Sequence, residues 1–483
     1  MRSRRPEPLI SVAVAIAVLI AATGCGTRRS EADLAAAAGV SAAAPSTAAP
    51  GEQSPGSAGV ATSADPAADD VSAAATPMGD SAVPFEGSAD AEAVPGAATA
   101  SGQPDEPAAP GAAPAQTAAN HDEIVIGSVG SISGIAGGVL KPAVEGLQVW
   151  VRWINGKGGL NGHPVRLIVA DDQADPARHR ALVQELVEQH GVIAFVQNGE
   201  ALTGAGSVSY HQSKRVPVIG SEGSNTYWNE NSMYFPHFSH GLNFGLATLA
   251  GQAQWTVEHG YKKIAQITCT EIASCSKAIE LWKKHAKYFG LDVVYQAQAS
   301  LAKPDYTAEC LNARNAGAEV ISVGLDGNGI SRLAAACGRQ GYFPAYAIPS
   351  ATVAAQHLSD RNIKQFGTDT PVAPFGSPPT AEMAEAFGKF LPGKTVVVSH
   401  VEGWTAGKMF ERAGGSIEEP TSAAVLEGLW TIQGEDLGGL TGPQTYTRDK
   451  PAKATTCWFV LEGKNGKFVP YNDGKRTCTD RKP

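Results

Sequence analysis

NGKGGLNG (residues 155–162) is the stretch of sequence that decides the fold. It ends a segment whose apolar residues recur at helical spacing, 142–155, and its glycines suit the end of a helix. PVRLIVA (164–170) follows as an expected strand and ends at Asp171-Asp172. EIVIGSV (123–129) predicts an earlier strand. Strand, helix and strand in this order predict a parallel sheet.

The same alternation continues along the chain. Asp175-Pro176 provides an N-cap and a first-turn proline for a helix that runs to about Gln189. Further strands are expected at 191–197, 216–220, 264–269, 293–296, 320–324, 345–349 and 395–398, and helices at 276–289 and 307–316. Parallel sheets of this kind bind ligands beyond the carboxyl ends of their strands, so the loops after the strands are the expected site.

The N-terminus predicts an export signal over residues 1–24. Three arginines precede an apolar run, 9–22, which is shorter than the roughly 20 residues that a membrane-spanning helix needs. The run ends in ATGC (22–25), which resembles the bacterial lipobox, so Cys25 is the expected lipidated residue. An ordinary secretory signal with an incidental cysteine is the alternative, and both Sec and twin-arginine export stay open.

Residues 25–120 contain the lipidated cysteine and then almost only Ala, Pro, Ser, Gly and Thr. Such a composition cannot bury enough apolar surface to order the chain, so a disordered tether is expected. Of the 38 basic and 47 acidic residues of the chain, five and thirteen precede His121, which leaves 33 and 34 in the remainder. The acidity therefore belongs mainly to the tether. The head, 121–483, is nearly neutral and without a basic run, which argues against nucleic-acid binding.

Six cysteines remain after Cys25, an even number that favours disulfides in an exported chain. Neighbours in sequence suggest three pairs, although fifteen connectivities exist: Cys269–Cys275, Cys310–Cys337 and Cys457–Cys478. A zinc site is the alternative, but no Cys-x-x-Cys pair occurs.

IGSVGSISG (126–134), NGKGGLNG and the strand that ends in Asp171-Asp172 together resemble the branched-chain amino-acid-binding (Leu/Ile/Val-type) family of ABC-transporter periplasmic substrate-binding proteins. The resemblance implies an α/β fold of two Rossmann-like lobes with parallel central sheets, joined by three crossovers (a type I periplasmic binding protein). By this analogy lobe one covers about 121–238 and 371–433, and lobe two covers about 239–370 and 434–483.

The resemblance also implies where a solute would bind. From lobe one it indicates the turns after the first, third and fourth strands, and from lobe two the loops after three of its strands. The expected ligand-binding residues are Ser133, Asn198, Glu200, Ala201, Glu222, Gly223, Ser224, Thr270, Glu271, Asp326 and Ser350. Tyr227 and Trp228 could pack on an apolar ligand or on their own lobe.

Two departures from the family pattern bear on the solute. Ala201 stands where a carboxylate-binding serine is expected, and Glu200 and Glu222 add negative charge. An unpaired charge in a closed site costs several kcal/mol. The hypothesis from the sequence is therefore a cationic or donor-rich solute rather than an ordinary branched-chain amino acid, with solvated loop glutamates as the alternative.

The expected role is solute binding for an importer, and not catalysis. No G-x-S-x-G, H-E-x-x-H or Walker motif occurs, no cofactor is implied, and His237 and His240 have no third metal ligand in view. The resemblance implies a small solute, amino-acid-like, amide or aromatic, an ABC permease with a separate ATPase subunit, and a monomeric head on the outer face of the cell membrane, anchored by lipid. A ligand-sensing module for a signalling partner and an exported enzyme are the competing functions.

Overall fold

The structure, a computed structural model, describes residues 122–483 apart from Glu222 and Ser224. The predicted signal peptide, Cys25 and the predicted tether lie outside the described residues, as do those two predicted site residues. Among the helices of the described part, none is long and apolar enough to cross a membrane.

The first sheet, which with its helices we call lobe one, has five parallel strands in the order β2-β1-β3-β4-β5. Their bounds are β1 Ile124–Gly130, β2 Val165–Asp171, β3 Ala194–Asn198, β4 Val218–Ser221 and β5 Tyr234–Phe235. The inner positions of β1 and β3 are almost all buried, whereas β2 at the edge of the sheet is mostly partly buried. This is the pattern of a sheet that is covered on both faces.

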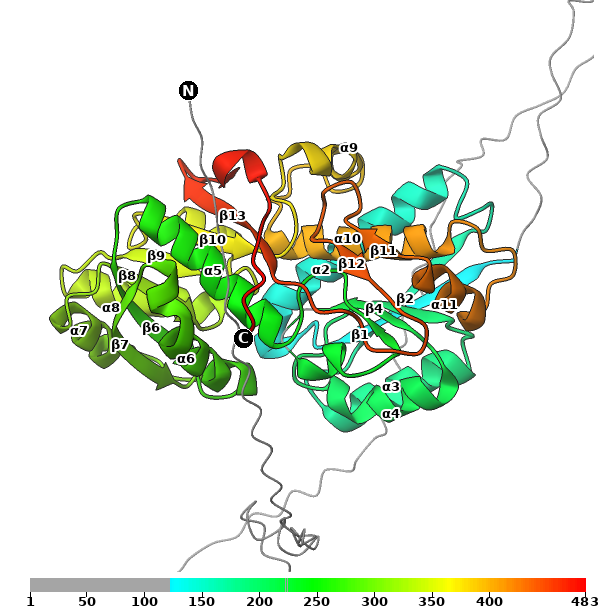
Figure 1. Cartoon of the computed structure of the whole chain (residues 1–483), viewed down its shortest axis with the longest axis horizontal. Coiled ribbons are helices and arrows are strands. Elements are labelled where there is room, and N and C mark those ends of the chain that lie inside the picture. The colour runs from blue at the N-terminus through cyan, green and yellow to red at the C-terminus, as the bar shows by residue number, and fades with distance from the viewer. Residues whose placement is uncertain (1–121, 222, 224) are drawn as a thin grey trace, which may run out of the picture. The chain divides into compact units, whose positions relative to one another are not determined.

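Helices cover both faces of this sheet (Figure 1). They are α2 Gly134–Gly156, α3 Pro176–Glu188, α4 Val208–Lys214, α9 Ala381–Phe390, α10 Val398–Gly414 and α11 Ser422–Trp430. Right-handed crossovers place α2 on one face and α3 and α4 on the other, and α10 packs beside α2. A Cβ at Gly403 would lie 1.8 Å from the Ala143 carbonyl oxygen, so glycine permits the close approach of these two helices.

The second sheet, lobe two with its helices, repeats the strand order of the first as β7-β6-β8-β9-β10. Its parallel strands are β6 Lys263–Cys269, β7 Asp292–Ala299, β8 Val320–Gly324, β9 Ala345–Ile348 and β10 Phe366–Thr370, and its helices are α5 Leu242–Glu258, α6 Ala273–His285, α7 Thr307–Asn315 and α8 Gly327–Arg339. The expectation of parallel strands holds for these five. An antiparallel extension, which was not predicted, continues the sheet beyond β10 with β13 Cys457–Lys464 and β14 Lys467–Pro470, and β15 Thr477–Cys478 pairs with β13.

Three crossovers join the lobes, between β5 and α5, between β10 and α9, and between α11 and β13. The third contains the ribbon β11 Gln433–Glu435 and β12 Gln444–Thr445. The crossovers lie side by side, since Ala373 N donates to Leu440 O at 2.8 Å and Thr441 Oγ1 donates to His237 O at 2.6 Å. A hydrogen bond from Tyr446 to the Pro236 carbonyl, 2.7 Å long, adds a further link.

Within the described residues three disulfides occur, all in lobe two or its extension: Cys269–Cys275, Cys310–Cys337 and Cys457–Cys478. These are the pairs of sequence neighbours that the cysteine spacing suggested. The first closes the loop after β6, the second joins α7 to α8, and the third fastens β15 to β13.

Two local predictions were wrong. The strand expected at 395–398 is absent, because Val397 is the N-cap residue of α10 and its N–H donates to His400 Nδ1 at 3.0 Å. The β-branched run there has no neighbouring strand to pair with. The first helix also begins earlier than predicted, at Gly134, with Pro142 inside it.

Candidate functional site in the strand-end loops and an interlobe cavity

The loops after β1 and β3 meet through backbone contact. A Cβ at Gly130 would lie 2.5 Å from the Gly199 Cα, and Ser131 N donates to Gly199 O at 3.0 Å. Because glycine has no Cβ, Gly130 permits this close approach of the two loops. Ser133 follows as the N-cap residue of α2; it is exposed and its side chain makes no capping hydrogen bond.

Asn198 and Glu200, both predicted ligand residues, are fully buried at the end of β3. The Asn198 Oδ1 accepts from Val129 N at 3.0 Å, and its Nδ2 donates to Glu200 Oε2 at 3.2 Å. The preceding residue, Gln197, has a φ of 54°, which is unusual for a residue other than glycine. The end of β3 is thus held in a bent conformation by side-chain contacts within lobe one.

A buried polar network joins the loops after β1, β2 and β3. Asp172 accepts from Ser131 Oγ at 2.7 Å and from Thr203 Oγ1 at 2.6 Å, and its Oδ2 lies 2.9 Å from His179 Nδ1. On the other side of the ring, His179 Nε2 lies 3.4 Å from Glu200 Oε2, an ion-pair distance. His179, on α3, therefore lies between two carboxylates that come from different loops.

The surroundings set the charge of this network. Burial alone would lower the pKa of His179, but hydrogen bonding and charge attraction from Asp172 and Glu200 outweigh burial and raise the pKa to about 9. Burial alone would raise the pKa of Asp172, but the hydrogen bonds from His179, Thr203 and Ser131 outweigh burial and lower the pKa below its usual value. His211, also buried nearby, is neutral because burial lowers its pKa to about 4.

This geometry changes the electrostatic argument about Glu200. The hypothesis from the sequence treated Glu200 as an unpaired negative charge that favours a cationic solute. In the structure its carboxylate faces His179 and Asn198 and is 0% exposed. Glu200 is therefore a buried carboxylate with partners inside lobe one, and it does not present a free negative charge to a cationic solute. A direct solute contact by Asn198 or Glu200 stays a prediction.

The remaining predicted residues of lobe one lie around the β4 loop. Gly223 is buried with a φ of 84°, and its carbonyl accepts from Gly241 N at 2.9 Å, which ties the loop to the first crossover. Ala201 is partly buried, and its carbonyl accepts from Asn225 Nδ2 at 3.2 Å. Trp228 is 0% exposed, so it belongs to the core of its own lobe.

In lobe two, the predicted residues fasten loops. Thr270 and Glu271 are exposed after β6, and the Glu271 carboxylate accepts from Ser300 Oγ at 2.6 Å and from Leu301 N at 2.8 Å. These bonds outweigh desolvation and lower its pKa. Asp326 is the N-cap of α8 and accepts from the backbone of Asn328 and Gly329. Each therefore has a local structural role, whatever it contributes to solute binding.

Ser350 is fully buried after β9, with its Oγ 3.4 Å from Asp369 Oδ2. Asp369 lies near the end of β10 and also accepts from Gln252 Nε2 at 3.3 Å. Burial raises the pKa of Asp369 to about 6. This carboxyl group, close to the second crossover, was not predicted.

His237 and His240 lie in the first crossover and are fully buried. His237 Nε2 is 3.1 Å from Glu402 O, and the His240 ring stacks on Phe238 with the ring centres 4.7 Å apart. Burial lowers the pKa of His240 to about 3 and that of His237 well below its usual value. No group of His, Cys, Asp and Glu able to hold a metal occurs within the described residues.

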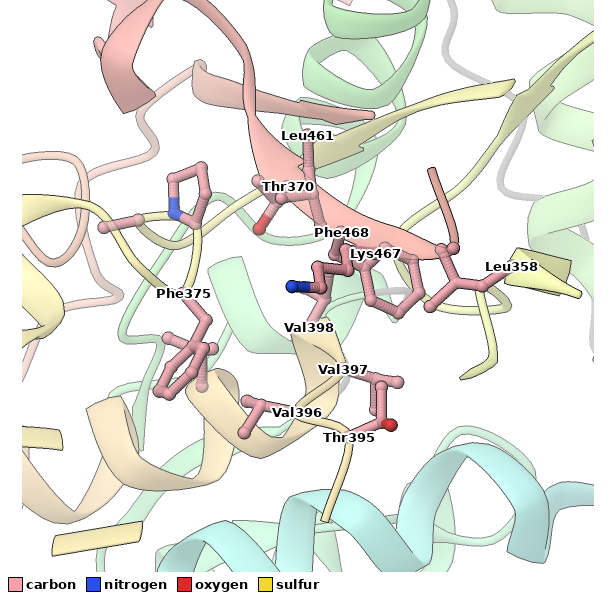
Figure 2. A pocket seen from close by; sticks show the side chains of 14 residues that line it. Leu358, Thr370, Phe375, Thr395, Val396, Val397, Val398, Leu461, Lys467 and Phe468 are labelled. Carbon is pink, nitrogen blue, oxygen red and sulfur yellow. The ribbon is translucent and has the colours of Figure 1, made fainter. Parts of the chain in front are cut away.

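A cavity of about 340 Å³ lies beside the second crossover (Figure 2). Its walls come from the segment before α10, from the crossover and from the β13–β14 hairpin, so both lobes contribute. The lining side chains are mostly apolar, with Lys467 the charged one: Leu358, Thr370, Ala373, Pro374, Phe375, Thr395, Val396, Val397, Val398, Val401, Leu461, Gly466, Lys467 and Phe468. None of the residues predicted from the sequence lines it.

Sequence reasoning thus missed His179, Thr203, Asp369 and Lys467. The sequence analysis used the Asp171-Asp172 pair as a motif. A histidine seven residues after Asp172, in the first turns of the next predicted helix, was the available signal for His179. For Lys467 the signal was Asn465-Gly466, a turn dipeptide that predicts a hairpin. Neither signal shows what the side chain contacts.

Two similar α/β lobes, three adjacent crossovers and polar loops at the strand ends define a two-lobed ligand-binding protein. The chain belongs to the periplasmic binding protein family, whose characteristic sequence pattern matches residues 123–467. No curated protein sequence matches the chain. The resemblance to this class of binding proteins, and the fold that it implied, are confirmed.

Solved structures share the fold at low sequence identity. The fatty acid ABC transporter substrate-binding protein from Thermomonospora curvata has a TM-score of 0.62 at 16% identity, with 74% of this chain and 93% of that chain covered. A branched-chain amino acid ABC transporter protein from Thermus thermophilus with bound valine has 0.62 at 16%, covering 75% and 98%. An R. palustris solute-binding protein in complex with benzoate has 0.59 at 14%, covering 74% and 98%.

Proposed function

We propose that this protein is the extracytoplasmic solute-binding subunit of an ABC importer, and that it captures a small solute between its two lobes without chemical change. The solute passes to a permease whose ATPase is a separate subunit. Cys25 anchors the chain by lipid to the outer face of the membrane, and residues 26–120 act as the tether of a monomeric head.

The observation that carries this proposal is the cavity walled by both lobes. Val396 and Val397 precede α10 in lobe one and Val398 begins it, whereas Leu461 and Phe468 belong to the sheet of lobe two. A solute that contacts both walls stabilises the arrangement in which they approach one another. Binding would then be read out as a change in the relative position of the lobes, which a permease can recognise.

The solute class proposed from the sequence is amino-acid-like, amide or aromatic. The structurally similar proteins are named for a fatty acid, for benzoate and for valine. These solutes share an apolar body and a carboxylate. A cavity of this size, at the lower end of the usual range of about 300–1,000 Å³ for ligand pockets, suits a small solute.

The test is to identify what the purified protein carries. Denaturation and mass spectrometry of the released small molecules are expected to recover one unchanged solute, and adding it back should raise the melting temperature of the emptied protein. A thermal-shift panel of amino acids, amides, polyamines and aromatic acids extends the search. Recovery of a chemically converted molecule would instead indicate an enzyme.

A further inference from the structure

The cavity beside the second crossover has one charged residue, the cation Lys467, in an otherwise uncharged lining. Its walls are apolar, and Figure 2 shows the Lys467 Nζ among Thr370, Phe375 and Val398. The Thr370 hydroxyl is already engaged, since it donates to the Val372 carbonyl at 2.8 Å. Among the lining residues, Lys467 is therefore the one that can form an ion pair with a bound solute.

The hairpin fixes the position of this lysine. Asn465 and Gly466 have φ values of 52° and 72°, the left-handed conformations of a two-residue hairpin turn, and Lys467 pairs with Lys464 across it. Because the turn is short and β14 is paired along its length, the base of the Lys467 side chain has little freedom to move away.

Two carboxylates on neighbouring elements, Glu462 and Glu145, already have other partners. Glu462 lies 3.4 Å from His259 Nε2 and 3.9 Å from Lys464 Nζ. Glu145, close to the start of α10, lies 2.8 Å from Lys394 Nζ and 3.1 Å from His400 Nε2. Among the described residues, no carboxylate lies within ion-pair distance of Lys467.

We infer that this cavity binds an apolar or aromatic monocarboxylate, with the apolar body against Val396 to Val398 and Phe468 and the carboxylate paired with Lys467. This inference rests on the proposed function and names its solute class. It reverses the expectation of a cationic solute, because Glu200 is buried against His179 and Asn198, whereas Lys467 is exposed at the cavity and has no carboxylate partner among the described residues.

The consequence for lobe closure is direct. Lys467 belongs to lobe two, and the valine wall belongs to lobe one. The carboxylate of the solute pairs with Lys467, and its apolar body packs against the valines. One solute molecule makes both contacts only when the two walls are close together. A neutral analogue of the same shape keeps the second contact and loses the first.

The experiment is a calorimetric titration of the full chain with two pairs of probes, benzoate with benzamide and octanoate with octanamide. At least one carboxylate is expected to bind about tenfold more tightly than its amide, because a charge-assisted pair is stronger than a neutral one. Lys467→Gln should weaken carboxylate binding about tenfold and leave the amide unchanged. Lys464→Gln, the matched control across the turn, should change neither.

A second variant tests the location independently of charge. Val396→Phe reduces the cavity and should weaken the carboxylate and the amide alike. Equal affinity for carboxylate and amide, a preference that survives Lys467→Gln, or no binding of any of the four probes would overturn the inference. If the protein instead carries a solute of another class that stabilises it, the proposed function stands while the inference fails; if it carries and binds no solute, both fail.

Discussion

His179 in lobe one and His240 in the first crossover are both fully buried, yet their surroundings give them opposite charge. His179 has a carboxylate on each side, from Asp172 and Glu200, and its pKa rises to about 9. His240 lies against Trp228 and Phe238, with ring centres 4.8 Å and 4.7 Å away, and its pKa falls to about 3. Burial acts on both in the same direction, so the carboxylates make the difference.

The difference separates two structural tasks. A charged histidine between carboxylates from two loops holds those loops in one arrangement through directional contacts. Neutral rings in the crossover pack like other aromatic side chains, and the His240 Nδ1 is 2.8 Å from the Phe238 carbonyl oxygen. His179 thus holds the loops that are predicted to meet the solute through charge, whereas His240 contributes to the first crossover through packing.

Removing one carboxylate should have the largest effect on this comparison. Asp172→Asn leaves the His179 imidazolium buried with one charged partner, and breaking a buried pair typically costs about 3–5 kcal/mol. Urea unfolding at pH 7 should show a loss of that size in the free energy of unfolding. Asp171→Asn, whose Oδ1 accepts only from backbone N–H groups, is the matched control and should lose far less. Equal losses would mean that the charge pairing in the network is unimportant.

Acid should act through the crossover histidine. The pKa of His240 is about 6.5 when unfolded and about 3 when folded, so its contribution to stability is complete above pH 6.5 and is lost as the pH falls toward 3. Between pH 7 and pH 4 the free energy of unfolding of the wild-type protein should fall by about 3 kcal/mol more than that of His240→Phe. Parallel losses in the two proteins would show that His240 takes up its proton while folded.

Alkali should act through His179 instead. Its folded pKa of about 9 lies above the unfolded value, so its contribution is present below pH 6.5 and is lost as the pH rises through 9. We expect the free energy of unfolding to fall by about 2–3 kcal/mol between pH 6.5 and pH 9. His179→Gln should be less stable than the wild-type protein at pH 6.5, and its free energy of unfolding should change little between pH 6.5 and pH 9. A carbon-13 NMR titration of the ring gives the same pKa directly.

The smallest effect concerns the hydroxyl that supports the pair. Thr203→Val keeps the shape but removes the 2.6 Å hydrogen bond to Asp172. A hydrogen bond to a charged group is worth about 1.5–3 kcal/mol, and Asp172 keeps His179 and Ser131, so a loss of about 1–2 kcal/mol is expected in urea unfolding. Hydrogen exchange should quicken in residues 198–204, and exchange that stays at the wild-type rate would place Thr203 outside the network.

Much of the fold could be predicted from local patterns. The strand at Val320–Gly324 and the helix that begins at Pro176 have the predicted starts, because an apolar run and an Asp-Pro cap are local signals. The antiparallel β13–β14 extension was missed, since its pairing with β10 joins residues far apart in sequence. The false strand at 395–398 shows the converse, because β-branched residues favour a strand only where a neighbouring strand exists.

The site was less predictable. The resemblance indicated Asn198 and Glu200, but the charge of Glu200 depends on His179, which lies on another element. Lys467 and the valines before α10 come together only through the crossovers, and no spacing rule brings positions 396 and 467 into one cavity. Long-range packing therefore decides which charges are balanced and which are available.

The central claim is that the two lobes close on a solute, and a distance between them tests it most directly. Arg180→Cys on α3 and Lys283→Cys on α6 place spin labels on exposed positions of the two lobes, while the six cysteines of the described residues are paired in disulfides. Saturation with the solute recovered from the protein should shift the label-to-label distance distribution, measured by double electron–electron resonance, to one narrower population. A distribution that stays unchanged while the solute is bound would contradict the account.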